Sequence, residues 1–130
     1  MKVSELGEFG MINLLTEVAH NSRDKAATSW QQLFLGISDD AAVWYGDSAM
    51  QLATVDALRQ GIHFTLETTP WADLGWKALA VNLSDIAAMG GLPRYALISL
   101  ALPDQTEVEN VVTLYKGIIK LARQFGVTII

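Results

Sequence analysis

Apolar residues recur at helical spacing near the N-terminus and then gather in short runs. Five of them follow one another at intervals of three: Leu6, Phe9, Ile12, Leu15 and Val18. This spacing predicts an amphipathic helix. Beta-forming residues separated by turn residues come next, and they predict strands at residues 33–37, 41–44, 51–55 and 62–65.

A helical period returns in the second half of the chain. It begins at residue 72, and Gly90, Gly91 and Pro93 end the predicted helix. Residues 95–102 are mostly apolar and predict a fully buried strand. A second long helix is predicted over residues 107–125, because acidic residues stand near its start and basic residues near its end, as the helix dipole favours. Gly126 ends this predicted helix, and the last residues predict one more strand.

This order of elements predicts an α+β fold, an α/β sandwich. We expect one domain with a mixed sheet of about four to five strands covered on one face by helices. Because the strands are apolar at both alternating positions, we expect the other face of the sheet to pair with a second copy of the chain, which would make a homodimer.

Composition narrows the classes of protein. With 51% hydrophobic residues the chain is globular rather than disordered. Its net charge of −5 argues against a nucleic-acid partner, because such surfaces are usually basic. The apolar stretches are interrupted well short of a bilayer span, so we expect no membrane partner. Without cysteine there is no thiolate metal site, and a cytoplasmic location is the default.

Four carboxylates stand within otherwise apolar sequence: Asp39, Asp40, Asp56 and Asp85. An ionised carboxylate in such surroundings is costly unless it is paired, hydrogen-bonded or bound to a cation. Carboxylates together with a hydroxyl such as that of Thr54 suit Mg²⁺. An acidic protein that binds phosphates also needs a cation as intermediary, so the sequence predicts a magnesium-phosphate site.

The acids differ in how strongly they support this site. Asp39 and Asp40 follow an apolar strand and fit either a metal ligand or a solvated turn. Thr54 and Asp56 would share one side of their predicted strand, which places a hydroxyl beside a carboxylate. Asp85 lies on an apolar stripe of its predicted helix, so it is either paired with a basic group or coordinates a cation.

Three other side chains have commoner structural explanations. A single histidine such as His63 is most often a satisfied core or surface residue. Lys77 could contact a phosphate, but an ion pair with Asp73 four residues earlier is the simpler expectation. Tyr115 would be an aromatic at the edge of the core. The sequence has no P-loop and no GxGxxG motif, so nucleotide phosphates would be bound without those cradles.

Longer motifs resemble a known family. In order they are GEFGMINLL, LGISDDAAV, VDALRQGIHF and WADLGWKALAVNLSDIAAMGGLPRYALISLALP. Over most of its length the chain resembles the N-terminal domain of thiamine-monophosphate kinase, in the aminoimidazole ribonucleotide synthetase superfamily. The resemblance implies an ATP-dependent transferase of thiamine biosynthesis that phosphorylates thiamine monophosphate to thiamine diphosphate. It also implies bound Mg²⁺ and dimerisation through the N-terminal sheets.

The family's site residues carry over to matching positions of this chain. The resemblance implies that His63 contacts thiamine monophosphate and that Tyr115 lies near ATP. No residue is assigned as a catalytic acid, base or nucleophile, because phosphoryl transfer would be direct and in line. The implied metal ligands are Asp39, Asp40, Thr54, Asp56 and Asp85.

The chain departs from the family pattern at a few positions. Ser38 stands where glycine is usual, Val55 where threonine or serine is common, and Arg59-Gln60 where Val-Glu is typical. In the family a Gly-Gly-Asp segment and a C-terminal domain follow the last strand. We therefore expect residues 1–130 to be the N-terminal domain of a two-domain kinase, with little turnover alone. A non-catalytic dimerising or nucleotide-binding module and another ATP-using enzyme of the superfamily stay open as alternatives.

Overall fold

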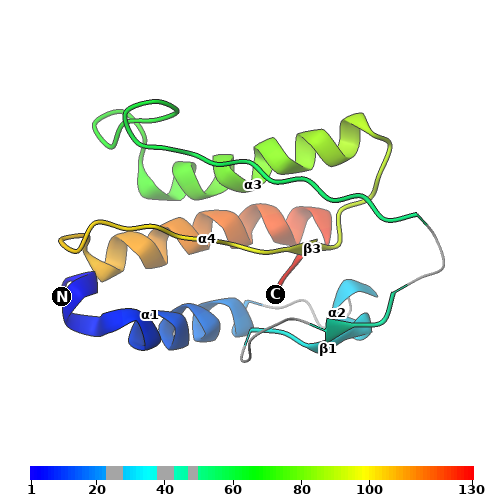
Figure 1. The fold of residues 1–130 in the computed structure, drawn as a ribbon, viewed down its shortest axis with the longest axis horizontal. Helices are drawn as coiled ribbons and strands as arrows, with labels where there is room; N and C mark the ends of the chain where they lie inside the picture. Colours follow the sequence, from blue (N-terminus) through cyan, green and yellow to red (C-terminus); the bar gives the residue numbers. More distant parts are fainter. Residues whose placement is uncertain (23–27, 38–42, 47–49) are drawn as a thin grey trace.

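A computed structural model describes residues 1–22, 28–37, 43–46 and 50–130. Its long helices lie along one another, with α4 between α1 and α3 (Figure 1). The helices are α1 (Val3–His20), α2 (Thr28–Gln32), α3 (Trp71–Ala88) and α4 (Val108–Phe125). The strands are β1 (Leu33–Leu35), β2 (Val43–Trp44), β3 (Tyr95–Ala96) and β4 (Thr128–Ile129).

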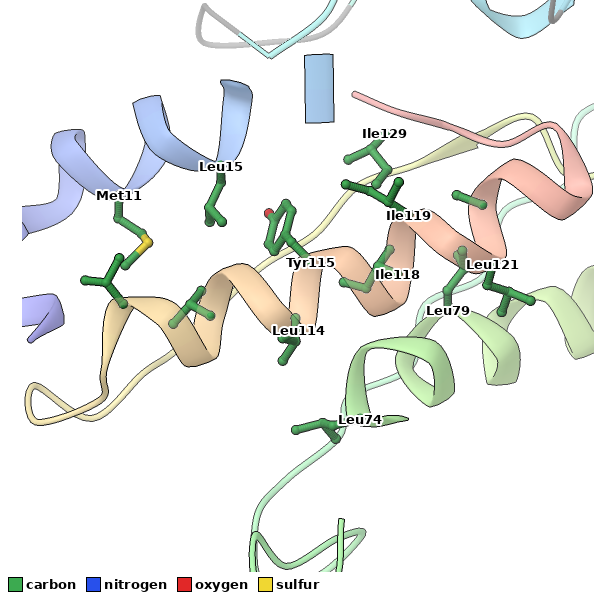
Figure 2. Packing of buried hydrophobic residues seen from close by; sticks show 13 residues of the cluster. Met11, Leu15, Leu74, Leu79, Leu114, Tyr115, Ile118, Ile119, Leu121 and Ile129 are labelled. Atoms are coloured by element: carbon green, nitrogen blue, oxygen red, sulfur yellow. The ribbon is translucent and has the colours of Figure 1, made fainter. Parts of the chain in front are cut away.

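Helix α1 confirms the helix that the N-terminal spacing predicts. It bends at Gly7, whose φ of 73° lies in the left-handed region that glycine enters without strain. The backbone N–H of Lys2 donates to Oε2 of Glu5 at 2.7 Å, which satisfies a donor at the helix start. Met11 and Leu15 are buried and point toward α4 (Figure 2).

Helices α3 and α4 confirm the two long helices predicted for the second half of the chain. They approach each other through Gly75 and Gly117, where an added Cβ would collide with the backbone of the facing helix. Gly126 ends α4 with a left-handed φ of 67°, as the sequence predicts. Figure 2 shows that buried residues of both helices meet in one core.

The strands form two separate sheets. β1 and β2 pair antiparallel and confirm parts of the predicted strands at 33–37 and 41–44, although residues 38–42 lie outside the described residues. β3 and β4 pair parallel, with Tyr95 opposite Thr128 and Ala96 opposite Ile129. The last residues therefore form the strand that the sequence predicts, and Thr128, Ile129 and Ile130 are buried.

Three predicted strands are wrong in whole or in large part. Residues 51–55 form no strand, and residues 62–65 form a turn with one isolated bridge. Of the predicted buried strand at 95–102 only β3 forms, and Leu97 beyond it is 77% exposed. The predicted mixed sheet of four to five strands is thus not formed within the described part of the chain, which has two two-stranded sheets. A strand needs a neighbour that pairs its N–H and C=O groups along its length, and outside β3 these segments form no such ladder among the described residues.

No helix among the described residues combines the length and the apolar character needed to cross a membrane.

Candidate functional site

An extended segment, residues 50–58, lies along α3 and brings distant residues into contact (Figure 1). Near the end of the helix, the hydroxyl of Thr54 donates to Oδ2 of Asp85 at 3.0 Å. Nearer its start, Nζ of Lys77 donates to the carbonyl oxygen of His63 at 2.8 Å. Two contacts about two helical turns apart therefore connect this part of the chain to one helix.

The contact between Thr54 and Asp85 joins two of the predicted metal ligands. They are 31 positions apart in sequence, and both are exposed. Asp85 accepts a neutral hydroxyl donor and makes no ion pair in the part of the chain that the structure describes. A carboxylate beside a hydroxyl, with its charge left uncompensated by a base, is an arrangement that a hard cation can complete.

Asp56 follows Thr54 by two positions and is exposed, with no ion pair to any described residue. The predicted geometry, in which strand alternation places the two side chains together, does not apply because residues 51–55 form no strand. Asp39 and Asp40 lie outside the described residues. Within the described ranges, no three His, Asp or Glu side chains form a group that could hold a metal ion. Convergence of all the predicted acids therefore stays a prediction.

His63 lies in a tight turn, residues 59–64, that follows the extended segment. Its side chain is exposed, and its Nδ1 accepts the backbone N–H of Arg59 at 3.0 Å. Its own N–H donates to the Arg59 carbonyl at 2.9 Å. His63 is thus held by local backbone groups rather than packed in the core, and one edge of its ring faces solvent.

Lys77 has a partner that the sequence did not indicate. An ion pair with Asp73 was the simpler expectation, but none forms, and the ammonium group instead donates to the His63 carbonyl. The reason is geometric, because the turn at residues 59–64 folds back over the first half of α3. No local signal could have shown this contact, since its partners are fourteen positions apart.

Tyr115 lies in the core between α4 and its neighbours (Figure 2). The residue is 7% exposed, and burial raises the pKa of its hydroxyl to about 12, so the phenol is neutral at physiological pH. A buried tyrosine hydroxyl usually has a hydrogen-bond partner. None is found for Tyr115 in the described part of the chain. The structure does not bring this residue into contact with Thr54, Asp85 or His63.

The chain was compared with known proteins and families. The family model described as "AIR synthase related protein, N-terminal domain" matches residues 38–130. A thiamine-monophosphate kinase from Bacillus subtilis (strain 168) is 36% identical over 128 residues, which is 96% of this chain and 36% of the relative. A thiamine-monophosphate kinase from Aquifex aeolicus (strain VF5) is 41% identical over 118 residues, 91% of this chain and 34% of the relative.

A solved structure agrees with these matches. This chain aligns with the crystal structure of a thiamine-monophosphate kinase from Stenotrophomonas maltophilia K279a, with a TM-score of 0.70 and 36% identity. The aligned region covers 100% of this chain and 37% of the chain in that crystal structure. The chain spans about a third of the length of the curated relatives that it matches. These findings confirm the resemblance that the sequence motifs indicate. Because the family model covers well over half of its residues, the chain belongs to the AIR synthase related protein family, through the N-terminal domain of that family.

Proposed function

We propose that the protein transfers the γ-phosphate of ATP to thiamine monophosphate and so makes thiamine diphosphate. The observation that carries this proposal is the identity of 36–41% to relatives named thiamine-monophosphate kinase, over more than nine tenths of the chain. Residues 1–130 would be the N-terminal domain of a two-domain kinase, because the chain spans only about a third of those relatives.

The proposed metal site holds Mg²⁺ through oxygen ligands. The hydrogen bond from Thr54 to Asp85 supports it, since it joins a hydroxyl and a carboxylate from segments far apart in sequence. Asp56 is two positions from Thr54, is exposed and makes no ion pair with any described residue, so its carboxylate is proposed as a further ligand. Bound Mg²⁺ would offset the charge of the transferred phosphate. The complete proposed ligand set is Asp39, Asp40, Thr54, Asp56 and Asp85.

The two substrates would contact different parts of the chain. His63 would contact thiamine monophosphate, and its exposed imidazole edge, fixed by the Arg59 N–H, supports this role. Tyr115 would lie near ATP, and its buried hydroxyl without a partner among the described residues supports a contact with a bound molecule. Transfer would be in line and direct, so these residues bind and orient the substrates and none forms a covalent intermediate.

A homodimer through the strand-forming segments is also proposed. Large apolar side chains stand exposed on residues 50–66 and 97–100, including Val55 at 90% and Leu97 at 77%. Exposed apolar surface of this extent is typical of an interface. The four-to-five-stranded sheet would then be completed by the partner or by the rest of a longer protein. A cytoplasmic location stays part of the proposal.

A chimera tests the activity. The 130-residue chain is joined after Ile130 to the part of the Bacillus subtilis relative that follows the matched region. With ATP, Mg²⁺ and thiamine monophosphate, we expect thiamine diphosphate, and a loss of at least about tenfold in rate for Asp56→Asn and Asp85→Asn. Asp104→Asn is the matched control, an exposed acid far along the chain. A folded chimera that makes no thiamine diphosphate would contradict the proposal.

A binding measurement on the 130-residue chain separates a site from a scaffold. Titration with a magnesium complex of a non-hydrolysable ATP analogue is expected to show weak binding that Asp85→Asn reduces and Asp104→Asn leaves unchanged. The isolated chain should turn over little or no thiamine monophosphate. Binding that is absent, or equal in all variants, would favour the non-catalytic module.

A further inference from the structure

The turn at residues 59–64 holds the imidazole of His63 in one orientation. The backbone N–H of Arg59 donates to its Nδ1 at 3.0 Å, and the N–H of His63 donates back to the Arg59 carbonyl at 2.9 Å. Gly61, with a φ of 80°, allows the chain to reverse and donates to the Phe64 carbonyl at 2.8 Å. The ring is therefore tied to the backbone of its own turn.

This arrangement selects one tautomer of His63. A backbone N–H can only donate, so the Nδ1 that faces it has to be an acceptor. In the neutral imidazole the proton is then on Nε2. Turning the ring over would place a carbon against the Arg59 N–H and lose the hydrogen bond. Because the side chain is exposed, the Nε2–H is left as a donor for an acceptor outside the turn.

Lys77 ties this turn to a rigid element. Its Nζ donates to the His63 carbonyl at 2.8 Å, and an ammonium group makes a charge-assisted hydrogen bond. Helix α3, which carries Lys77, is anchored against α4 by buried residues that include Leu74 and Leu79. The side chains of Arg59, Gln60, Ile62 and His63 are exposed, whereas Leu58 and Phe64 at the two ends of the turn pack against the core. Packing therefore holds the ends of the turn, and Lys77 holds its middle through the His63 carbonyl.

We propose that Lys77 is a positioning residue, which fixes the 59–64 turn so that His63 keeps its proton on Nε2 and donates it in a hydrogen bond to a phosphate oxygen. The identity of the acceptor, a phosphate monoester, rests on the proposed function. The tautomer of His63 and its dependence on Lys77 do not rest on the proposed function.

The tautomer can be measured directly in the ¹⁵N-labelled chain. Two-bond proton–nitrogen correlation spectra show which imidazole nitrogen carries the proton, and they are recorded at alkaline pH, where the imidazole is neutral. The chain has two histidines, so a His20→Gln variant assigns the signals. We expect His63 to populate the Nε2–H tautomer alone. A mixture of both tautomers in the unchanged chain would overturn the proposal.

Variants of Lys77 test its part. Lys77→Met keeps most of the side-chain length but removes the donor, so we expect a mixture of tautomers and exchange of the Arg59 amide that is about threefold to tenfold faster. Lys77→Arg keeps a donor at this position, so His63 should retain the single tautomer. Lys120→Met, on the exposed face of α4, is the matched control and should change neither observable. An unchanged tautomer and exchange rate in Lys77→Met would overturn the proposal.

Addition of thiamine monophosphate separates this inference from the proposed function. We expect it to shift the Nε2 signal of His63 and to bind the Lys77→Met chain about tenfold more weakly. If the tautomer depends on Lys77 but the ligand shifts no His63 signal, the phosphate acceptor is refuted together with the substrate assignment, and the positioning by Lys77 stands. If the ligand binds both chains equally and the tautomer is unchanged, the positioning role is refuted and the proposed function stands.

Discussion

Replacing Gly75 by alanine tests how closely α3 and α4 have to approach. A Cβ at Gly75 would lie 2.8 Å from the carbonyl carbon of Leu114, nearer still to the carbonyl oxygen, and 3.1 Å from the amide nitrogen of Ile118. Non-bonded carbon atoms need about 3.5 Å, so the helices would have to separate by roughly 0.7 Å or more. All of these atoms belong to the backbone, and no change of rotamer can relieve the contact.

The separation would loosen the core that the two helices share. A gap of roughly 0.5–1 Å forfeits about a quarter to a half of the attraction in each contact across it. Overpacking typically costs about 1–3 kcal/mol, and we expect the upper end because backbone meets backbone. Alanine recovers about 1 kcal/mol through its higher helix propensity. The net loss should be about 2 kcal/mol or more. The core residues involved are Leu74, Leu79, Leu114, Ile118 and Leu121.

Urea unfolding followed by far-ultraviolet circular dichroism gives the free energy of unfolding. Gly10→Ala is the control, since a Cβ there would meet only side-chain atoms of Leu6, and we expect a change within about 1 kcal/mol. Gly117→Ala, whose Cβ would lie 2.8 Å from the carbonyl carbon of Ala72, should resemble Gly75→Ala. If Gly75→Ala unfolds at the same urea concentration as the unchanged chain, the close approach of the helices is refuted.

Three further predictions concern stability. Ser29→Ala removes a buried hydroxyl that bonds Thr128 at 2.7 Å, so it should lower the free energy of unfolding by about 1–2 kcal/mol, and a double-mutant cycle with Thr128→Val should show positive coupling. A hydrogen bond from Lys2 lowers the pKa of Glu107. The stability that the ionised Glu107 contributes is therefore present above its ordinary pKa of 4.5 and is lost as pH falls through the lowered value. Acid unfolding of Glu107→Gln should lack this loss. Burial raises the pKa of Tyr115 to about 12, so stability should fall as pH rises from 10 toward 12, and Tyr115→Phe should remove this fall with little change at neutral pH.

The long helices could be predicted from the sequence because their hydrogen bonds are local. Apolar spacing predicted α1, but not its buried side, which is formed by Met11, Leu15 and Ala19 while Phe9 and Ile12 are exposed. The termination of α4 at Gly126 followed from the need for a left-handed residue. The bend at Gly7 was not predicted, since a single glycine near a helix start does not reveal its φ. The close packing through Gly75 and Gly117 was also not visible, because it depends on how two helices cross.

The strands were predicted less well because their hydrogen-bond partners are distant in sequence. Residues 51–55 and 95–102 have strand-like composition. Of these two segments, only the part that forms β3 pairs with another described strand, which is β4. Apolar composition says that a segment can be buried in a sheet. It does not say which segment lies beside it.

The sequence by itself determined the three long helices, the family and the choice of Thr54, Asp56 and Asp85 as candidate ligands, because these depend on local spacing and on acids placed among apolar residues. It did not indicate the short helix α2. Only the tertiary structure decided that Thr54 bonds Asp85 and that Lys77 holds the turn of His63 instead of pairing with Asp73. These contacts join residues 31 and 14 positions apart. The path of residues 50–64 along α3 creates them, and that path results from packing that no local pattern encodes.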